Sequence, residues 1–394
     1  MRIGIDCHNL EGQRTGVGRY ILNLMKEWLA NPTASGAEFN LYFKNAIPDD
    51  IRKISYAHDR ERKIKMRSLN SKRNALFKHF YLPHAARQDN IDVLFCPDYV
   101  LPLYVGGPAS HIKTAVTIHD IIYEARPNEY SWPSRADRVL LKWASKQSAK
   151  CADIIFVPSE FTRNEILKYY KIDSKKIVVT PLAPDRIFRE IPPPAKEEAG
   201  GVSKYILFVG SIFNRRFLPE CIQGFVKFAG ENKDFSPYGG PPEGWKFLVV
   251  GNNHTKPYRD IVKYISAANK ELGRDAIIWK KYIESDEELA ELYNAAFATI
   301  WLSSYEGFGL PVLESMACGT PVITSRAGSL PEIAGDAALY INNPKDPHEI
   351  ASALYHLARD RGYYDELVNT GLLQAQKFSW QKTARETLDK ILSL

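Results

Sequence analysis

The feature that most constrains the fold is a series of short, continuous apolar runs separated by longer helical patterns. Runs without polar alternation indicate strands that are buried on both faces, as in parallel sheets covered by helices. The strand-like runs are 2–7, 39–43, 92–96, 114–118, 153–157, 205–209, 246–250, 276–279, 298–302 and 321–324. Helical patterns fill the intervals, for example at 17–29, 218–228, 286–296 and 348–357. This repetition predicts a doubly wound α/β architecture with right-handed crossovers.

One segment interrupts the repetition. Residues 184–204 contain four prolines and the pair Gly200-Gly201, which cannot continue a helix or a central strand. A single open sheet of about ten strands would be unusual, so two domains are favoured over one large sheet with a long surface loop. We expect domains at 1–190 and 204–377, joined by a linker at 191–203. Ligands of such sheets bind at the carboxyl ends of the strands, so the search for chemistry begins there.

Composition excludes several classes of protein. Hydrophobic residues make up 45% of the 394 residues and charged residues 25%, which excludes a largely disordered chain or a coiled coil. Mean hydropathy is −0.30, and no apolar run approaches the ~18–20 residues of a membrane span. The amino-terminal run meets the acidic residue Asp6 after only three residues, which fits a buried strand better than a signal peptide, so we expect a cytoplasmic protein. The five cysteines are scattered without a C-x-x-C pair, so neither a disulfide framework nor a zinc site is predicted.

The positive charge is local. Residues 51–90 hold 11 Lys/Arg and 3 Asp/Glu, a net of 11 − 3 = +8, so the rest of the chain carries 6 − 8 = −2. This distribution argues against a field spread over the protein for binding nucleic acid. Aromatic residues Phe77, Phe80 and Tyr81 follow the basic ones, a combination that suits an anionic membrane face such as the inner face of the plasma membrane. A solvated loop and helix explains the segment equally well.

The most informative segment is 304–319, which reads Ser-Tyr-Glu-Gly-Phe-Gly-Leu-Pro-Val-Leu-Glu-Ser-Met-Ala-Cys-Gly. Gly307 and Gly309 let the backbone approach a ligand, and free N–H groups at a helix start attract phosphate. Glu306 precedes the expected helix and Glu314 falls about one turn into it, so both carboxylates can face one polyhydroxylated ligand. A capped helix with two solvated glutamates is the alternative, which the length of the string disfavours.

This string resembles the signature of the family-4 glycosyltransferases, with Glu306 and Glu314 as their E-x7-E pair. The resemblance covers nearly the whole chain and is nearest to a mannosyltransferase-like branch involved in surface-polysaccharide assembly. Further matching segments are 15–20, 119–120, 159–163, 321–324, 328–332, 335–338 and 378–380. The resemblance implies the GT-B fold, in which two Rossmann-like domains face each other across a cleft. It also implies that the final helix, 378–394, returns to the amino-terminal domain.

A second candidate site follows the strand-like run 205–209. Guanidinium groups match phosphate oxygens, but on Arg215 and Arg216 alone an exposed basic turn would be favoured. The resemblance instead implies that both arginines hold the diphosphate of a nucleotide-sugar donor. Ser211 stands where relatives carry Arg or Thr, and Phe217 replaces their Asn, so the sequence departs from the family pattern here.

The resemblance assigns further donor contacts to the segment 304–319. Glu314 is expected to bind the ribose and Glu306, as a catalytic-site residue, the hydroxyls of the transferred sugar. The remaining expected donor-binding residues are Ser211, Gly307, Phe308, Gly309 and Leu310. Lys281 and Tyr282 follow another strand-like run and are expected near the nucleotide base, although a solvated turn is nearly as good an interpretation.

In the amino-terminal domain, the loop before the first helix lacks the G-x-G-x-x-G pattern, which makes a nicotinamide cofactor a weak interpretation. The resemblance places Gly16 against the donor, Gly18 on the acceptor side and His119 at the reaction centre. Asp120 is expected to orient His119 or to hold the acceptor loop. Without the resemblance, a strand-to-helix turn and a structural histidine explain these residues.

No D-x-D sequence occurs, so we expect a metal-free transferase in which protein cations and helix N-termini stabilise the leaving diphosphate. The resemblance implies transfer with retention, most simply of mannose from GDP-mannose onto a glycan or lipid-linked saccharide, without a cofactor. Two alternatives stay open. One is a GT-B sugar-nucleotide epimerase or hydrolase, and the other is a non-catalytic glycosyltransferase-like binding subunit.

Overall fold

The computed structural model describes residues 1–12, 16–30, 36–58, 63–102, 105, 111–130, 132, 134–191, 205–230 and 244–394. Apart from Ile191, the linker predicted at 191–203 lies outside these residues, as do residues 59–62 of the basic segment 51–90. The chain forms two compact units. The first consists of Met1–Ala125, Trp132–Leu182 and Ser379–Leu394, and the second of Arg126–Ser131 and Ala183–Phe378.

The first unit is built on a parallel sheet of seven strands in the order β3-β2-β1-β4-β5-β6-β7. Its strands are β1 (Arg2–Asp6), β2 (Glu38–Phe43), β3 (Ile64–Ser68), β4 (Val93–Cys96), β5 (Lys113–Thr117), β6 (Ile154–Val157) and β7 (Ile177–Val179). From β1 the chain first builds toward β3, and it then crosses back to β4 on the other side of β1. The boundary between β1 and β4 is therefore the switch point of this sheet.

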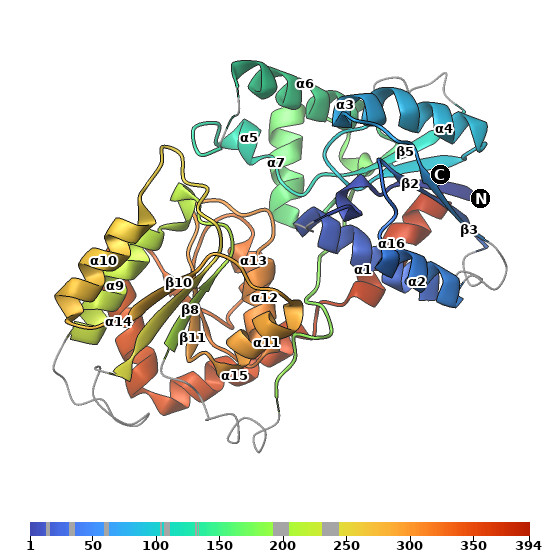
Figure 1. The fold of residues 1–394 in the computed structure, drawn as a ribbon. Helices are drawn as coiled ribbons and strands as arrows, with labels where there is room; N and C mark the ends of the chain where they lie inside the picture. Colours follow the sequence, from blue (N-terminus) through green and yellow to red (C-terminus); the bar gives the residue numbers. More distant parts are fainter. Residues whose placement is uncertain are drawn as a thin grey trace. The chain divides into compact units, whose positions relative to one another are not determined.

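Helices cover both faces of this sheet. They are η1 (His8–Leu10), α1 (Gly16–Ala30), α2 (Asp49–His58), α3 (Asn74–Leu76), η2 (Phe77–Tyr81), α4 (Leu82–Gln88), α5 (Ile122–Ala125), α6 (Arg135–Cys151), α7 (Glu160–Tyr170), η3 (Ser174–Lys176) and α16 (Trp380–Leu392). Right-handed crossovers place α1 and α2 on one face and α3, α4 and α6 on the other, as Figure 1 shows. The carboxyl-terminal helix α16 packs beside α1, where the indole N–H of Trp28 donates to the Ala384 carbonyl at 2.7 Å.

The second unit has a parallel sheet of six strands in the order β10-β9-β8-β11-β12-β13. The strands are β8 (Tyr205–Val209), β9 (Lys246–Val250), β10 (Ile277–Lys280), β11 (Ala298–Trp301), β12 (Val322–Ser325) and β13 (Leu339–Ile341). The helices are η4 (Asn214–Arg216), α9 (Leu218–Gly230), α10 (Ile261–Leu272), α11 (Asp286–Ala295), α12 (Leu310–Ala317), α13 (Leu330–Ala334), α14 (Pro347–Arg359) and α15 (Arg361–Ala375). The switch point of this sheet lies between β8 and β11.

Strand β8 shows why the apolar runs are continuous. Ile206 and Phe208 pack into one hydrophobic cluster, while the alternating Leu207 and Val209 pack into a second one. Because successive side chains point to opposite faces, both faces of the sheet are buried. The predicted doubly wound α/β class is confirmed, since both sheets are parallel and carry helices.

Three strands were not predicted from the sequence: β3, β7 and β13. All three lie at sheet edges, where one side lacks a neighbouring strand. β3 reads Ile-Lys-Met-Arg-Ser and is only partly buried, and β7 and β13 have three residues each. Edge position thus removes the long apolar signature on which the other predictions rest. Among the described residues, no helix combines the length and apolarity that a membrane crossing requires.

Candidate functional site

The carboxyl ends of β8 and β11, at the switch point of the second unit, carry most of the predicted donor-site residues. Residues 210–217 follow β8 and include η4, whereas residues 302–309 follow β11 and lead into α12. The two loops are bonded together, since the backbone N–H of Ser304 donates to the Arg215 carbonyl at 3.0 Å. Segments that are separate in the sequence therefore meet where parallel sheets bind their ligands.

An ion pair joins these loops. The Nε of Arg216 donates to Oε1 of Glu306 at 3.2 Å, and its Nη1 donates to the Ser211 carbonyl at 2.9 Å. The guanidinium carbon lies 4.0 Å from the centre of the Trp301 ring, a cation–π geometry. Burial lowers the pKa of Arg216, and Glu306 opposes that shift. The arginine remains a cation, so a buried positive charge is fixed at the strand ends.

Gly210 makes this placement of Arg216 sterically feasible. Its φ is +120°, and a Cβ here would lie 2.9 Å from both Nη1 of Arg216 and the Trp301 ring. A side chain at this position would push against the guanidinium on one side and the indole on the other. The glycine at the end of β8 therefore determines where the arginine can lie.

Arg215 contributes a second cation with unused bonding capacity. Its guanidinium carbon lies 4.2 Å from the centre of the Phe213 ring. Its Nε is buried and has no hydrogen-bond partner within the described part of the chain. A buried donor without an acceptor is costly, and an anionic ligand at this place would remove that cost.

Residues that follow β12 hydrogen-bond to the loop 306–309 and pack closely against it. The hydroxyl of Ser329 donates to the carbonyls of Glu306, at 3.0 Å, and Phe308, at 2.7 Å. A Cβ on Gly328, whose φ is +60°, would lie 2.5 Å from the Glu306 carbonyl oxygen. This close backbone packing fixes the start of α12, whose Leu310 and Pro311 form the first turn.

Two further carboxylates lie on this side of the second unit. Glu314, on α12, is 4% exposed, and its Oε2 accepts a hydrogen bond from the Tyr293 hydroxyl at 3.1 Å. Glu129 belongs to the short segment Arg126–Ser131, and its Oε2 accepts a hydrogen bond from the Ser304 hydroxyl at 2.6 Å. Glu129 was missed in the sequence analysis, because nothing in its local pattern indicates that it meets a loop 175 positions away.

Lys281 and Tyr282, predicted near the nucleotide base, are exposed residues that follow the edge strand β10. The Lys281 ammonium lies 5.5 Å from the centre of the Trp279 ring. β9 separates β10 from β8 in the sheet. No contact between this pair and the Arg216–Glu306 ion pair is found in the described residues, so their assignment stays a prediction.

In the first unit, His119 follows β5 and is partly buried. Its Nε2 lies 3.1 Å from the Pro97 carbonyl oxygen, and the edge of the ring packs at 5.0 Å from Tyr20 between centroids. Burial lowers the pKa of His119, which favours the neutral ring. Asp120 accepts a hydrogen bond from the Ile122 backbone N–H at 3.0 Å and so supports the start of α5.

The predicted glycines of the first unit differ in surroundings. Gly16 is the first residue of α1 and is exposed, with open space where a Cβ would lie. Gly18 is buried within the same helix. Thr15, which precedes them in the matching motif, lies outside the described residues.

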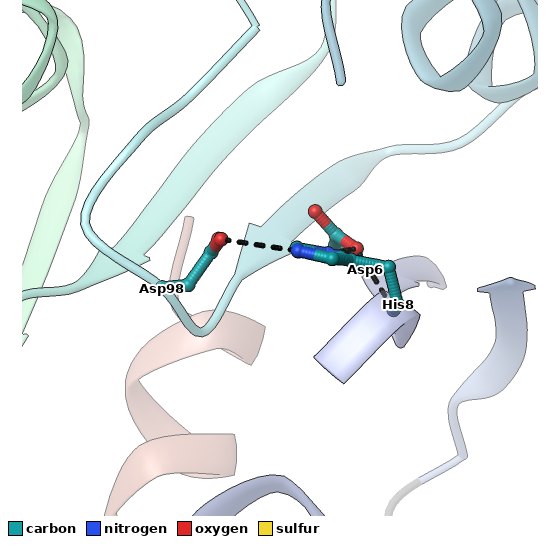
Figure 2. Close-up of side chains that lie close together, drawn as sticks. All are labelled: Asp6, His8 and Asp98. Atoms are coloured by element: carbon teal, nitrogen blue, oxygen red, sulfur yellow. Dashed lines mark hydrogen bonds and ion pairs between the residues drawn. The ribbon is translucent and has the colours of Figure 1, made fainter. Parts of the chain in front are cut away.

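A charged cluster at the switch point of the first unit was missed in the sequence analysis, and Figure 2 shows three of its side chains, Asp6, His8 and Asp98. Asp6 ends β1 and Asp98 follows β4, and the ammonium of Lys78 forms ion pairs with both, at 2.6 Å from Oδ2 of Asp6. The Nδ1 of His8 lies 2.7 Å from Oδ1 of Asp6, and its Nε2 lies 3.7 Å from Oδ2 of Asp98. We name these four residues the Lys78 cluster.

Electrostatics in the Lys78 cluster stabilise the charged forms of Asp6 and Lys78. Burial would raise the pKa of Asp6, but Lys78 and His8 outweigh it and hold that pKa well below its usual value. Burial would lower the pKa of Lys78, but both aspartates raise it. Asp6, His8 and Asp98 also have metal-ligand spacing, with their ligand atoms within 4.8 Å of one another. Since the ammonium already bridges the two carboxylates, the donor set fits a protein cation better than a metal ion.

Comparison with known proteins places these features in a family. Residues 14–185 match the model of Glycosyltransferase Family 4, and residues 194–373 match that of glycosyl transferases group 1. The chain belongs to glycosyltransferase family 4. Its two units thus correspond to the two matched regions, and the predicted family is confirmed.

The chain is similar to curated mannosyltransferases of Escherichia coli. It is 27% identical over 406 residues to O-antigen chain mannosyltransferase B, with 99% of each chain covered. It is also 28% identical over 295 residues to the serotype-specific mannosyltransferase WbdA. This match covers 72% of this chain and 34% of WbdA. The chain therefore spans about a third of the length of WbdA.

Among solved structures, the chain is similar to Anabaena HepE in complex with UDP and glucose. The TM-score is 0.70 at 13% sequence identity, and all of both chains is covered. At this identity the similarity concerns the fold alone, and it confirms the GT-B fold predicted for this glycosyltransferase.

Proposed function

We propose that this glycosyltransferase moves mannose from GDP-mannose onto a glycan or lipid-linked saccharide, with retention of configuration, during surface-polysaccharide assembly. The observation that carries the proposal is the Arg216–Glu306 ion pair at the strand ends of the second unit, beside Arg215 and the start of α12. The choice of mannose is supported by similarity to O-antigen chain mannosyltransferase B.

The cations would stabilise the leaving group. As the bond between the anomeric carbon and the diphosphate breaks, negative charge accumulates on the diphosphate oxygens. Arg216 is already fixed by Glu306, Ser211 and Trp301, so little reorganisation is needed. Arg215 would donate to the same oxygens from its Nε, which no described residue bonds. The N–H groups at 307–310 would add the positive end of α12.

The carboxylates would bind hydroxyls. Glu306 faces the guanidinium with one oxygen, a geometry in which a sugar hydroxyl can donate to the same carboxylate. Glu314 would bind the ribose after exchanging its bond with Tyr293. The acceptor hydroxyl would attack the anomeric carbon while its proton passes to an oxygen of the leaving diphosphate. In this proposal, His119 and the backbone at Gly16 are the donor contacts that the first unit supplies.

This reaction needs no metal ion, since the chain supplies two arginines where the diphosphate charge develops. The proposal predicts full turnover in the presence of a chelator. A strict requirement for Mg²⁺ or Mn²⁺ would contradict this part of it.

Donor screening tests the proposal directly. The full chain is heated with GDP-mannose, GDP, UDP-glucose or ADP-glucose, because a ligand that binds only the folded state raises the melting temperature. GDP-mannose should give the largest shift and, with a mannose-terminated acceptor, a glycoside product. Release of GDP without a glycoside would indicate a hydrolase, and binding without any turnover would indicate a binding subunit.

The Glu306→Gln variant removes the charge of the carboxylate while keeping its shape. Turnover should fall by about 100-fold or more, because the partner of Arg216 and a hydroxyl acceptor are both weakened. Glu366→Gln, an exposed change on α15, is the matched control and should turn over normally. Equal activity of the two variants would overturn the role of Glu306.

A further inference from the structure

Two helical segments of the first unit expose large apolar side chains to solvent. On α6, Val139 is 69% exposed, Leu140 61% and Trp143 47%. On α3 and η2, Leu76 is 41% exposed, Phe80 60% and Tyr81 46%. Adjacent apolar residues such as Phe77 and Leu82 are fully buried. The segment α3–α4 therefore has one apolar side that packs in the core and a second apolar side that faces solvent. We call the six exposed residues the apolar surface.

The topology places both segments on the same side of the sheet. The connection from β3 to β4 contains α3, η2 and α4, and the connection from β5 to β6 contains α6. Both connections run in the same direction across the strand order. Right-handed crossovers therefore put them on one face, as Figure 1 shows. Each helical segment begins at the carboxyl edge of the sheet, so the first halves that bear the apolar surface lie toward one edge.

The net charge around the apolar surface is positive. Residues 72–88 contain four Lys/Arg and no Asp/Glu, and residues 135–151 contain five Lys/Arg and one Asp. Lys72, Arg73, Arg135 and Arg138 are exposed, whereas Lys78 is buried in its cluster and Lys142 pairs with Glu124 at 3.0 Å. Apolar side chains, three of them aromatic, thus lie among exposed cations.

We propose that the apolar surface docks this glycosyltransferase onto an anionic phospholipid bilayer. A bilayer offers both components that the surface complements. Phosphate headgroups attract the cations, and the acyl boundary accepts Leu140, Trp143 and Phe80. Tryptophan and tyrosine suit this depth because one end of each ring is polar. The contact lies on α3–η2 and α6, so it covers only part of the basic segment 51–90 and adds a helix outside it.

Vesicle co-sedimentation of the full chain tests the proposal. The protein should pellet with vesicles that contain phosphatidylglycerol and stay in solution with pure phosphatidylcholine. Leu140→Gln combined with Trp143→Gln should lower the partition coefficient by about tenfold or more, because two apolar side chains no longer leave water. Leu373→Gln on α15, where Leu373 is 61% exposed, removes a comparable side chain elsewhere and should bind normally.

A charge arm separates the electrostatic contribution. Arg135→Gln combined with Arg138→Gln should weaken binding to phosphatidylglycerol vesicles by about tenfold or more, and added salt should weaken wild-type binding. Lys382→Gln combined with Arg361→Gln removes the same charge from other helices and should leave binding unchanged.

Fluorescence gives a readout at one residue. Trp143 is the exposed member of the seven tryptophans, all of which lie in the described residues; the others are buried or half-buried. Brominated lipid should therefore quench the wild type strongly and Trp143→Phe weakly, although that variant still binds. Failure to pellet with anionic vesicles, or equal binding by wild type and the Leu140/Trp143 variant, would overturn the proposal. So would self-association that the same variant abolishes without any vesicle binding, because the surface would then join two copies of the chain.

Discussion

The two switch points of the molecule carry charge in opposite ways. In the second unit, Arg216 pairs with Glu306, while the buried Nε of Arg215 has no hydrogen-bond partner among the described residues, so a cationic donor stays available at the strand ends. In the first unit, Lys78 is bonded to both Asp6 and Asp98, and His8 completes the cluster. The same parallel topology thus supports one site with an available cationic donor and one whose charges are largely satisfied internally.

This difference suggests a division of labour between the units. A leaving diphosphate needs cations that are fixed but not fully neutralised, and the second unit supplies them. The Lys78 cluster instead joins η2 to the ends of β1 and β4, and so it holds three separate segments of the first unit in register. We therefore expect changes at the first switch point to affect stability most, and changes at the second to affect turnover most.

Lys78→Met should produce the largest effect. Removing the ammonium leaves the buried Asp6 carboxylate without its main partner, which is expected to cost roughly 3–5 kcal/mol of unfolding free energy. Amide hydrogen exchange followed by mass spectrometry should show faster exchange in β1 and β4 and unchanged exchange in β8 and β11. Lys65→Met on β3, where Lys65 is exposed, is the matched control and should change neither set. Equal loss of protection in both sheets would contradict the assignment of Lys78 to the first unit's stability.

Arg216→Lys should produce the next largest effect, and this effect is on turnover. Lysine keeps the charge but cannot donate from one planar group to Glu306 and the Ser211 carbonyl together. We expect the kcat to fall by about 100-fold, equivalent to about 2.7 kcal/mol, with the unfolding of the first unit unchanged. Arg361→Lys, an exposed change on α15, should have no effect. Normal turnover by Arg216→Lys would remove the arginine fork from the mechanism.

Gly210→Ala should affect both stability and turnover of the second unit. The added Cβ meets Nη1 of Arg216 and the Trp301 ring at a positive φ, so a cost of about 1–3 kcal/mol is expected together with a shifted guanidinium. Gly273→Ala is the control, since Gly273 also has a positive φ of 66° but open space around its Cβ position. It should destabilise the second unit without lowering turnover. If both variants lose turnover alike, strain and not the position of Arg216 is responsible.

The sequence predicted most of the fold and part of the site, for identifiable reasons. Central strands were found because both of their faces are buried, as in β8, whereas β3, β7 and β13 lack that pattern at the sheet edges. Arg216 and Glu306 could be proposed because each follows a central strand and lies in a segment that resembles the motifs of the family.

Lys78 could not be found in this way. It lies in η2, 72 positions from Asp6, and in the sequence it is one of 11 basic residues in 51–90. Only the fold distinguishes it from the exposed cations that surround it. An ion pair between a helix and a distant strand cannot be predicted from the local sequence, because neither helical spacing nor composition indicates which buried carboxylate the side chain will contact.

The smallest expected effect is a pH dependence that is confined to the first unit. Burial favours the neutral ring of His8, but Asp6 and Asp98 outweigh it and raise the pKa of His8 above its usual value. A group whose pKa is raised on folding stabilises the fold fully below its unfolded pKa of about 6.5, and this stabilisation is lost as the pH rises through the folded value. Protection of β1 and β4 amides, corrected for intrinsic exchange, should therefore decrease as the pH rises through that window.

His8→Asn isolates this contribution, because the amide can still donate to Asp6 but does not titrate. The decrease in protection of β1 and β4 should disappear in this variant and persist in His348→Asn, an exposed change at the start of α14. Protection of β8 and β11 should not follow the same pH window in any of the three proteins, because Arg216 stays charged throughout it. A pH response of equal size in both sheets would mean that the two switch points are coupled, and the division between a structural cluster and a ligand-binding one would then fail.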